Sequence, residues 1–316
     1  MPKFKIRHLT KYSYVVPVRD SANQIILYPL KDDYQEVTQQ QITVTGDVPI
    51  ETHTDYFGNQ VGTFTYSKPH YELCIDSRLT VVTRSRKKPV NEVTAEKQWQ
   101  ELSKLKTQLQ FIDFLRQESF DGISEANEVV DQVREKKCTP FESVIELCSF
   151  VFNNFNYKQG ITTVESTLDE IWKIKTGVCQ DFAHVLLAML RLIDIPSRYV
   201  SGYICPNKNG MRGEGATHAW VETYIPFYGW LGIDPTNNCV VDENHVRLAV
   251  GRNFSDCSPV KGTYRGTSED TLEVIVSVSY EDGSTTEDSN EVTEHEPINS
   301  VSKNSYRRHQ EIQMQQ

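Results

Sequence analysis

The chain has 316 residues, of which 24% are charged and 38% hydrophobic, a composition typical of a globular protein with one large domain or two ordinary ones. Its formal net charge of −10 argues against nucleic-acid binding, which needs a basic surface, and against electrostatic binding to an anionic membrane. The N-terminus has no apolar run of the signal-peptide type, and no stretch reaches about 18 apolar residues, so we expect a cytoplasmic protein that is not in a membrane.

Residues 1–84 are predicted to form an antiparallel β-sandwich. Segments such as NQIILYPL, QQITVTG and SRLTVVT are short, rich in β-branched and aromatic residues, and separated by turn sequences such as TGD and FGN. The histidines of this region, His8, His53 and His70, have no partner in the local pattern, so we favour packing or surface roles for them.

From about residue 92 the hydrophobic spacing becomes helical. The apolar residues three and four apart that predict an amphipathic helix are Leu102, Leu105, Leu109, Ile112 and Leu115. A second helix is predicted to begin at TPFE, where Thr139 is the N-cap, Pro140 the first helical residue and Glu142 the partner of a capping box. Cys148 lies on the apolar face of this helix, which predicts that it packs in the core.

After residue 195 the sequence again predicts strands, in SRYVSGYI, THAWVETYI, GWLGIDPT and LEVIVSVSY. Residues 281–316 are polar with few large apolar side chains, and we expect a disordered tail there. The expected organisation is therefore a β-rich domain at 1–84, a core at 85–280 and the tail at 281–316.

The seven cysteines are scattered, at positions 74, 138, 148, 179, 205, 239 and 257. No CxxC pair occurs, and Cys239, His245 and Cys257 do not have a standard zinc spacing, so we expect neither a disulfide framework nor a metal or cofactor.

Cys179 is the candidate nucleophile. It follows Gly177 and Val178 and opens a predicted apolar helix that ends before Pro196. Free N–H groups and the helix dipole in the first turn of a helix favour an anion, and the thiolate is the reactive form of cysteine. The alternative is a small apolar packing residue, so the reactive interpretation needs a base and a group that orients the base.

The segment GATHAWVETYIPFYGWLGIDPTNN supplies both. A hairpin centred on Pro226 pairs residues 222 with 230, 220 with 232 and 218 with 234, which predicts that His218 faces Asp234 on one side of the sheet. A shift by one residue would separate them to opposite faces. Packing of the Cys179 helix against this sheet would then bring the thiol to the free ring nitrogen of His218.

Five segments in this order, GVCQDFAH, RYVSGYI, HAWVE, GW and DPTNN, resemble the transglutaminase-like cysteine enzymes, especially the microbial branch with a β-rich N-terminal region. The resemblance implies an α+β, papain-like cysteine proteinase fold, with Cys179 as nucleophile, His218 as general base and then acid, and Asp234 as the residue that orients the imidazole. It also implies attack on an amide through a thioester. The zinc-binding CxxC pairs of the N-glycanases and the calcium sites of the large animal crosslinking enzymes have no counterpart in the sequence.

Several neighbouring residues have weaker assignments. Tyr157, and less strongly Gln159, are candidates for the second oxyanion donor beside the backbone N–H of residue 179. Gln180 is expected to line the surroundings of the thiol. Trp220 shares the His218 face and is expected either to wall the cleft or to pack in the core.

Two residues of the Cys179 helix are expected to have other roles. We expect Asp181 to act either as a helix cap or as a support of the site. His184 lies about 140° around the helix from the candidate nucleophile, and we expect it to be a support residue.

We therefore predict thiol-dependent acyl chemistry on an amide or isopeptide bond of a peptide or protein substrate, with hydrolysis by a cysteine peptidase or amidase favoured. One alternative is transglutaminase-type transfer of the acyl group to an amine, because water and amines compete for the same thioester. The other is a non-catalytic binding module that has kept the fold.

Overall fold

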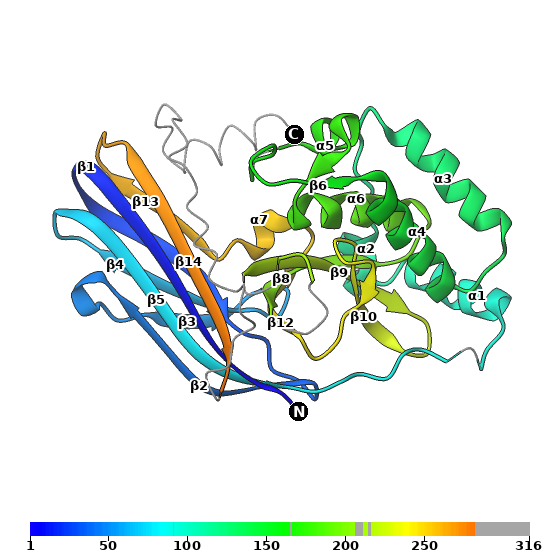
Figure 1. Ribbon diagram of the computed structural model, residues 1–316, viewed down its shortest axis with the longest axis horizontal. Helices are drawn as coiled ribbons and strands as arrows, with labels where there is room; N and C mark the ends of the chain where they lie inside the picture. The colour runs from blue at the N-terminus through cyan, green and yellow to red at the C-terminus, as the bar shows by residue number, and fades with distance from the viewer. Residues whose placement is uncertain (91, 165, 206–210, 214–215, 282–316) are drawn as a thin grey trace.

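In the computed structural model the chain forms a β-rich unit and an α+β unit that pack against each other (Figure 1), described over residues 1–90, 92–164, 166–205, 211–213 and 216–281. The described strands are β1 (Lys3–Tyr28), β2 (Gln35–Val44), β3 (Glu51–Thr54), β4 (Gln60–Tyr66), β5 (His70–Thr83), β6 (Asn156–Tyr157), β7 (Thr176–Gly177), β8 (Ser197–Ile204), β9 (Thr217–Ile225), β10 (Gly229–Asp234), β11 (Cys239–Val240), β12 (His245–Gly251), β13 (Val260–Arg265) and β14 (Asp270–Tyr280). The described helices are α1 (Ala95–Leu105), α2 (Leu109–Leu115), α3 (Ile123–Glu135), α4 (Pro140–Asn154), α5 (Leu168–Ile174), α6 (Cys179–Leu192) and α7 (Phe254–Cys257), with a 3-10 turn, η1 (Thr45–Asp47). The tail predicted at 281–316 lies outside the described residues except for Glu281.

The N-terminal unit is built around one long strand, β1. Its first half pairs with β5 and β14 and its second half with β4 and β13, all antiparallel, in the strand order β2-β5-β1-β4-β3 with β13 and β14 also on β1. The predicted antiparallel β architecture is confirmed. Strands β13 and β14 come from the range expected for the core, so this sheet draws on both ends of the sequence.

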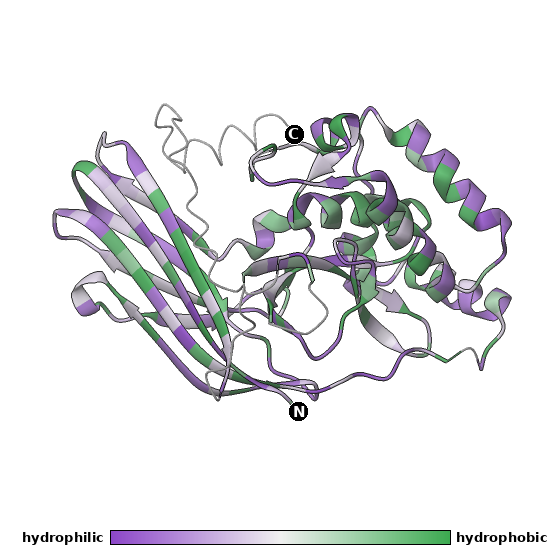
Figure 2. Ribbon diagram, viewed as in Figure 1, coloured by the Kyte–Doolittle hydropathy of each residue, from purple (hydrophilic) through white to green (hydrophobic). Residues whose placement is uncertain are grey.

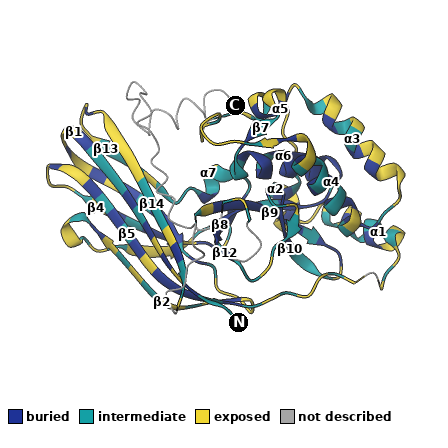
Figure 3. Ribbon diagram, viewed as in Figure 1, coloured by how far each residue is buried: buried dark blue, intermediate teal, exposed yellow. Residues whose placement is uncertain are grey.

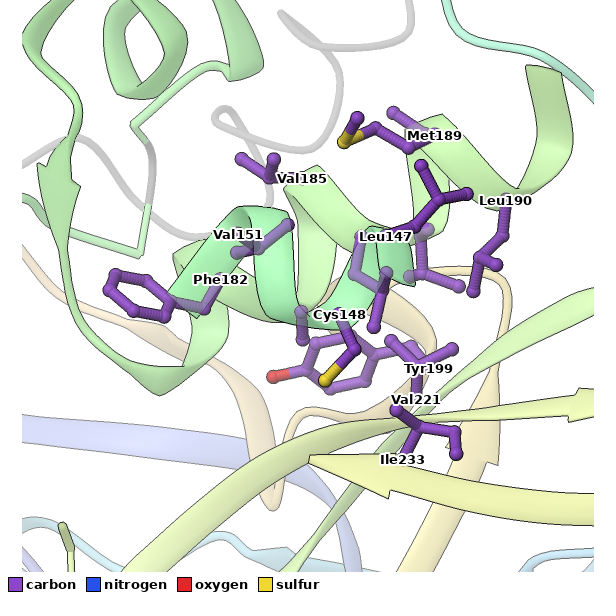
Figure 4. Close-up of a cluster of buried hydrophobic side chains, with 14 of the residues drawn as sticks. Leu147, Cys148, Val151, Phe182, Val185, Met189, Leu190, Tyr199, Val221 and Ile233 are labelled. Carbon is purple, nitrogen blue, oxygen red and sulfur yellow. The ribbon is translucent and has the colours of Figure 1, made fainter. Parts of the chain in front are cut away.

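The second unit contains a five-stranded antiparallel sheet in the order β11-β10-β9-β8-β12, with α6 packed across β8 and β9 and α4 packed against α6 and β10. Helix α6 is strongly hydrophobic (Figure 2) and is buried along most of its length (Figure 3). Leu147, Cys148 and Val151 of α4 belong to the same cluster as Phe182 and Val185 of α6 (Figure 4). The packing role predicted for Cys148 is therefore confirmed.

Of the two helices predicted before residue 155, the structure confirms the start of one and divides the other. The capping box of α4 is present: Glu142 N–H donates to Thr139 Oγ1 at 3.3 Å, and Thr139 N–H donates to Glu142 Oε2 at 2.8 Å. The predicted helix over residues 102–115 is wrong as a single element, because the chain breaks between α1 and α2. Within α2 the phenylalanines are buried in place of Leu109, which is 79% exposed, since aromatic side chains bury more apolar area.

The face of the core sheet away from α6 packs on the N-terminal unit, and two side-chain amides complete the outer edge of β12. Gln35 Nε2 donates to the Arg247 carbonyl at 2.8 Å and Gln35 Oε1 accepts from Arg247 N–H at 2.7 Å. Asn59 makes the same pair of bonds to Val250, both at 2.8 Å. These bonds satisfy backbone groups that an edge strand otherwise leaves open.

None of the helices in the described part of the chain has the length and hydrophobicity of a membrane-spanning helix.

Candidate active site

Cys179 is the first residue of α6, and its side chain is half-buried at the edge of the core. The first helical hydrogen bond runs from Phe182 N–H to the Val178 carbonyl at 3.1 Å, so the N–H groups of the first residues of α6 have no partner inside the helix. These donors and the positive end of the helix dipole stabilise negative charge next to the thiol, as the sequence predicts.

Asp181 fixes the backbone that leads into Cys179. Its Oδ2 accepts the Val178 N–H at 2.7 Å and the Thr162 hydroxyl at 2.6 Å, and the carboxylate is buried. Gly177 does not have a positive φ, so the position does not need a glycine for its backbone conformation. A Cβ at Gly177 would lie 2.3 Å from Asp181 Oδ2, so the glycine makes room for this carboxylate.

His218 lies near the start of β9, fully buried beside Asp234 of β10, with Nε2 2.9 Å from Asp234 Oδ2. Burial lowers the pKa of His218, but the charge and hydrogen bond of Asp234, with a further contribution from Cys179, raise it to about 10. The other nitrogen, Nδ1, is buried and has no other partner among the described residues, and the thiol of Cys179 raises the pKa of the ring through a hydrogen bond as well as through its charge. Since Asp234 occupies Nε2, the thiol contacts the imidazole at Nδ1, where a proton can pass between the two groups.

The hairpin that joins His218 to Asp234 differs in register from the prediction. Gly229 pairs with Ile225 and Gly232 with Glu222, two positions away from the expected pairing of 222 with 230. The cause is the turn: Phe227 adopts a left-handed φ of +64°, and the loop centres on it instead of on Pro226. Because the shift is two residues, both side chains stay on one face, and His218 meets Asp234 diagonally.

Asp234 is the most heavily hydrogen-bonded carboxylate of the site. Its Oδ1 accepts the N–H of Thr236 at 2.9 Å and of Asn237 at 3.3 Å, and its Oδ2 accepts Asn237 Nδ2 at 2.7 Å. Burial raises the pKa of Asp234, but His218 and His245 outweigh burial and hold it well below its usual range. The run DPTNN contained a signal for the first two bonds, since an aspartate commonly accepts backbone N–H groups two and three residues on.

His245 on β12 is a second histidine on the same carboxylate, and the sequence analysis did not find it. Its Nε2 lies 3.4 Å from Asp234 Oδ2 and its Nδ1 lies 3.2 Å from Asp242 Oδ1. Burial lowers the pKa of His245, whereas the two carboxylates raise it and prevail. Among the described residues, His218, Asp234 and His245 bring potential metal-ligand atoms within 4.8 Å of one another. A metal ion there would have to replace the hydrogen bond that holds His218.

The weaker candidates occupy different places. Tyr157 lies in the short parallel pair β6–β7 opposite Gly177, beside the entrance to the nucleophile, and Gln180 is half-buried in the first turn of α6. Gln159 is exposed. Trp220 is fully buried, with its ring 6.2 Å from that of His218 and stacked on it, so it supports the imidazole as a core aromatic.

His184 has the support role that its place on the helix predicts. Its Nε2 accepts the Phe254 N–H at 3.2 Å, and burial lowers its pKa to about 4, so it is a neutral acceptor.

Four of the other cysteines lie in environments that disfavour a thiolate. Burial raises the pKa of Cys148, Cys205 and Cys257, and raises that of Cys239 to about 12. These cysteines therefore remain protonated near neutral pH and are poor nucleophiles.

Comparisons with known proteins match both units of the chain. Residues 127–235 match the transglutaminase-like superfamily and residues 4–82 match the bacterial transglutaminase-like N-terminal region. Protein ML0607 of Mycobacterium leprae is 31% identical over 283 residues, which cover 88% of this chain and 99% of that protein. The protein-glutamine gamma-glutamyltransferase of Pseudomonas aeruginosa is 31% identical over 123 residues, 36% of this chain and 18% of that one.

A solved structure from Cytophaga hutchinsonii, of a protein thought to be a cysteine protease, has the same fold, with a TM-score of 0.65 and 20% identity over 92% of this chain and 96% of that chain. Together with the two family matches, it accounts for both the β-rich unit and the core. The chain belongs to the transglutaminase-like superfamily and carries the N-terminal region of its bacterial members.

Proposed function

We propose that the protein is a cysteine peptidase or amidase that cleaves an amide or isopeptide bond of a peptide or protein. The observation that carries the proposal is the placement of Cys179 at the start of α6, next to a buried His218 whose opposite nitrogen is held 2.9 Å from Asp234. A thiol, a base and a group that orients the base are the three parts that nucleophilic catalysis requires.

The chemistry follows from the placement of these groups. An imidazolium at His218 stabilises a thiolate at Cys179, whose Sγ attacks the substrate carbonyl carbon. The unbonded N–H groups in the first turn of α6 stabilise the resulting oxyanion. His218 then gives its proton to the leaving amine as the C–N bond breaks and a thioester forms. Water attacks the thioester, losing its proton to His218, and the acid is released with the thiolate restored.

Transfer to an amine is the second candidate. It is favoured by the similarity of 36% of this chain to a protein-glutamine gamma-glutamyltransferase. The same thioester serves both reactions, and the outcome depends on whether water or an amine reaches it first.

One experiment separates the two functions. A mixed library of peptides and isopeptides is incubated with the protein, with and without a tagged primary amine, and the products are identified by mass spectrometry. Cleaved products that do not depend on the amine support hydrolysis. Tagged glutamine side chains in uncleaved peptides would instead show that the protein transfers the acyl group to an amine.

The control is a pair of cysteine variants. We expect Cys179→Ala to lose at least about 10⁴-fold in kcat, as removal of a catalytic nucleophile does. Cys138 is also half-buried but lies before α4, so Cys138→Ala should keep the parent rate. Turnover by Cys179→Ala close to that of the parent would refute both candidate activities at this site.

A further inference from the structure

The segment Met211–Gly213 lies against the reacting side of His218. A Cβ built on Gly213 would be 3.1 Å from His218 Nδ1, the nitrogen that faces away from Asp234. The backbone next to Arg212 thus passes over the nitrogen that exchanges a proton in the proposed reaction. A substrate bound across Cys179 and His218 must come close to this segment.

Arg212 is anchored to the catalytic carboxylate through one asparagine. Its N–H donates to Asn237 Oδ1 at 2.8 Å, and its carbonyl accepts from Asn237 Nδ2 at 3.3 Å. The same Nδ2 donates to Asp234 Oδ2 at 2.7 Å. The backbone position of Arg212 is therefore fixed relative to Asp234 and His218.

The side chain of Arg212 extends over an aromatic wall on the other side of the site. Its guanidinium carbon lies 4.7 Å from the ring centre of Phe152 and 5.9 Å from that of Tyr157. Tyr157 pairs with Gly177, two residues before the nucleophile, and its ring lies 6.2 Å from that of Phe182 in α6. The backbone of this segment therefore adjoins His218, while the guanidinium lies over a ring that adjoins the start of α6.

Among the described residues, the charge of Arg212 has no carboxylate partner. The residue is exposed, and none of the carboxylates in the described part of the chain lies within the 4.0 Å of an ion pair. Within the described part of the chain, its side chain donates to the Thr236 carbonyl, at 3.4 Å. Most other described arginines have a carboxylate partner, in a chain whose net charge is −10. A guanidinium stacked on rings keeps its N–H edge free for a planar anion.

We propose that Arg212 is the recognition site for a carboxylate of the substrate, so that the protein acts on peptides with an aspartate, a glutamate or a free carboxyl group close to the scissile amide. This inference rests on the proposed acyl chemistry at Cys179 and names its substrate class. The carboxylate accepts two N–H bonds from the guanidinium, in the bidentate arrangement that arginine favours.

The test uses series of matched peptides, each of which varies one position between three residues before and three residues after the scissile amide. That position carries glutamate, glutamine or lysine. The readout is the ratio of kcat/KM for the glutamate and glutamine peptides, in which any general loss of activity cancels. We expect a ratio of about tenfold or more at one position for the parent protein, from charge-assisted hydrogen bonds. Arg212→Gln should bring the ratio to about one, and Arg212→Glu should favour lysine.

Arg86 provides the matched control. It also lies over two aromatic rings, those of Tyr34 and Tyr228, at 4.6 and 5.0 Å, and it has no carboxylate within ion-pair distance among the described residues. Arg86→Gln should leave the ratio unchanged. A parent ratio near one at every position, or a ratio that survives in Arg212→Gln, overturns the proposal.

Binding separates this proposal from the proposed activity. Cys179→Ala protein, which retains Arg212, should bind the glutamate peptide at least about tenfold more tightly than the glutamine peptide by fluorescence anisotropy. If no peptide is turned over but this difference in affinity is found, the activity is wrong and the carboxylate site stands. If peptides are turned over and the two affinities are equal, the carboxylate site is wrong and the activity stands.

Discussion

The interface between the two units and the start of β9 each bury a histidine, and the two histidines differ in charge. In the interface, His8 Nδ1 lies 3.0 Å from the hydroxyl of Tyr203, and burial lowers the pKa of His8 to about 4. In the candidate active site, burial acts on His218 in the same direction, but Asp234 reverses the shift and the pKa rises to about 10.

The difference shows what separates a packed histidine from a reactive one in this fold. Both rings are removed from water, so burial is common to the two and does not explain the difference. The partner explains it: a neutral hydroxyl leaves the imidazole neutral, whereas a carboxylate held by four other donors keeps its own charge and makes the imidazole a cation.

The change that most directly removes this difference is Asp234→Asn. The amide is nearly the same size but uncharged, so the pKa of His218 should fall toward that of His8, and kcat should fall by about 10³- to 10⁴-fold because the imidazole loses its orientation. NMR titration of the His218 ring in the folded variant and steady-state kinetics measure both effects. An unchanged kcat together with an unchanged ring pKa would show that Asp234 does not control the histidine.

A smaller effect is expected from the second histidine on Asp234. His245→Phe removes the donor at 3.4 Å from Asp234 Oδ2, and we expect kcat/KM to fall about 10- to 100-fold, as for the loss of one hydrogen bond to a charged group. His245→Gln keeps a donor and should recover part of the loss, and the pH dependence of kcat/KM should shift in both variants. Equal losses in the two variants with an unshifted pH profile would indicate that His245 only fills space.

The smallest effect is expected for His8, the neutral histidine of the comparison with His218. Since the pKa of His8 is near 6.5 when unfolded and about 4 when folded, the unfolded state takes up a proton first as the pH falls. His8 should therefore cost about 2 kcal/mol of stability between pH 7 and pH 5. The contribution of His218 to stability depends on pH in the opposite direction. Because its pKa is raised, this contribution is present below about pH 6.5 and is lost as the pH rises toward 10.

Urea unfolding of the parent and of His8→Gln at both pH values measures this cost. The variant lacks the titrating ring, so its loss of stability between pH 7 and pH 5 should be smaller than that of the parent. Equal losses in the two proteins would mean that His8 does not remain neutral in the folded state.

Local patterns in the sequence predicted the parts of the site that depend on local structure. The N-cap at Thr139, the helix that begins at Cys179 and the shared face of His218 and Asp234 each follow from a short spacing rule. The hairpin register was missed by two residues because Phe227, a non-glycine residue, has a left-handed backbone. The side chains still met because a strand alternates with a period of two.

The parts of the fold and of the site that were not predicted depend on contacts between residues far apart in the sequence, and such contacts leave no local signal. His245 reaches Asp234 from the opposite edge of the sheet, two strands beyond β9. The pairing of β1 with β14 joins residues near the start of the sequence to residues near 275. Neither β-branched content nor hydrophobic period specifies a partner across such a distance.

The long first strand has a consequence for synthesis of the protein. Strand β1 meets β5 and β4 within the first 83 residues, but its other edge is covered only by β13 and β14, at Val260–Arg265 and Asp270–Tyr280. At the usual rate of translation these strands leave the ribosome on the order of tens of seconds after β1. During that time an open strand edge faces the crowded cell, where it is a template for pairing with another chain. The nascent chain therefore keeps one edge of β1 unpaired while the whole α+β unit is being made.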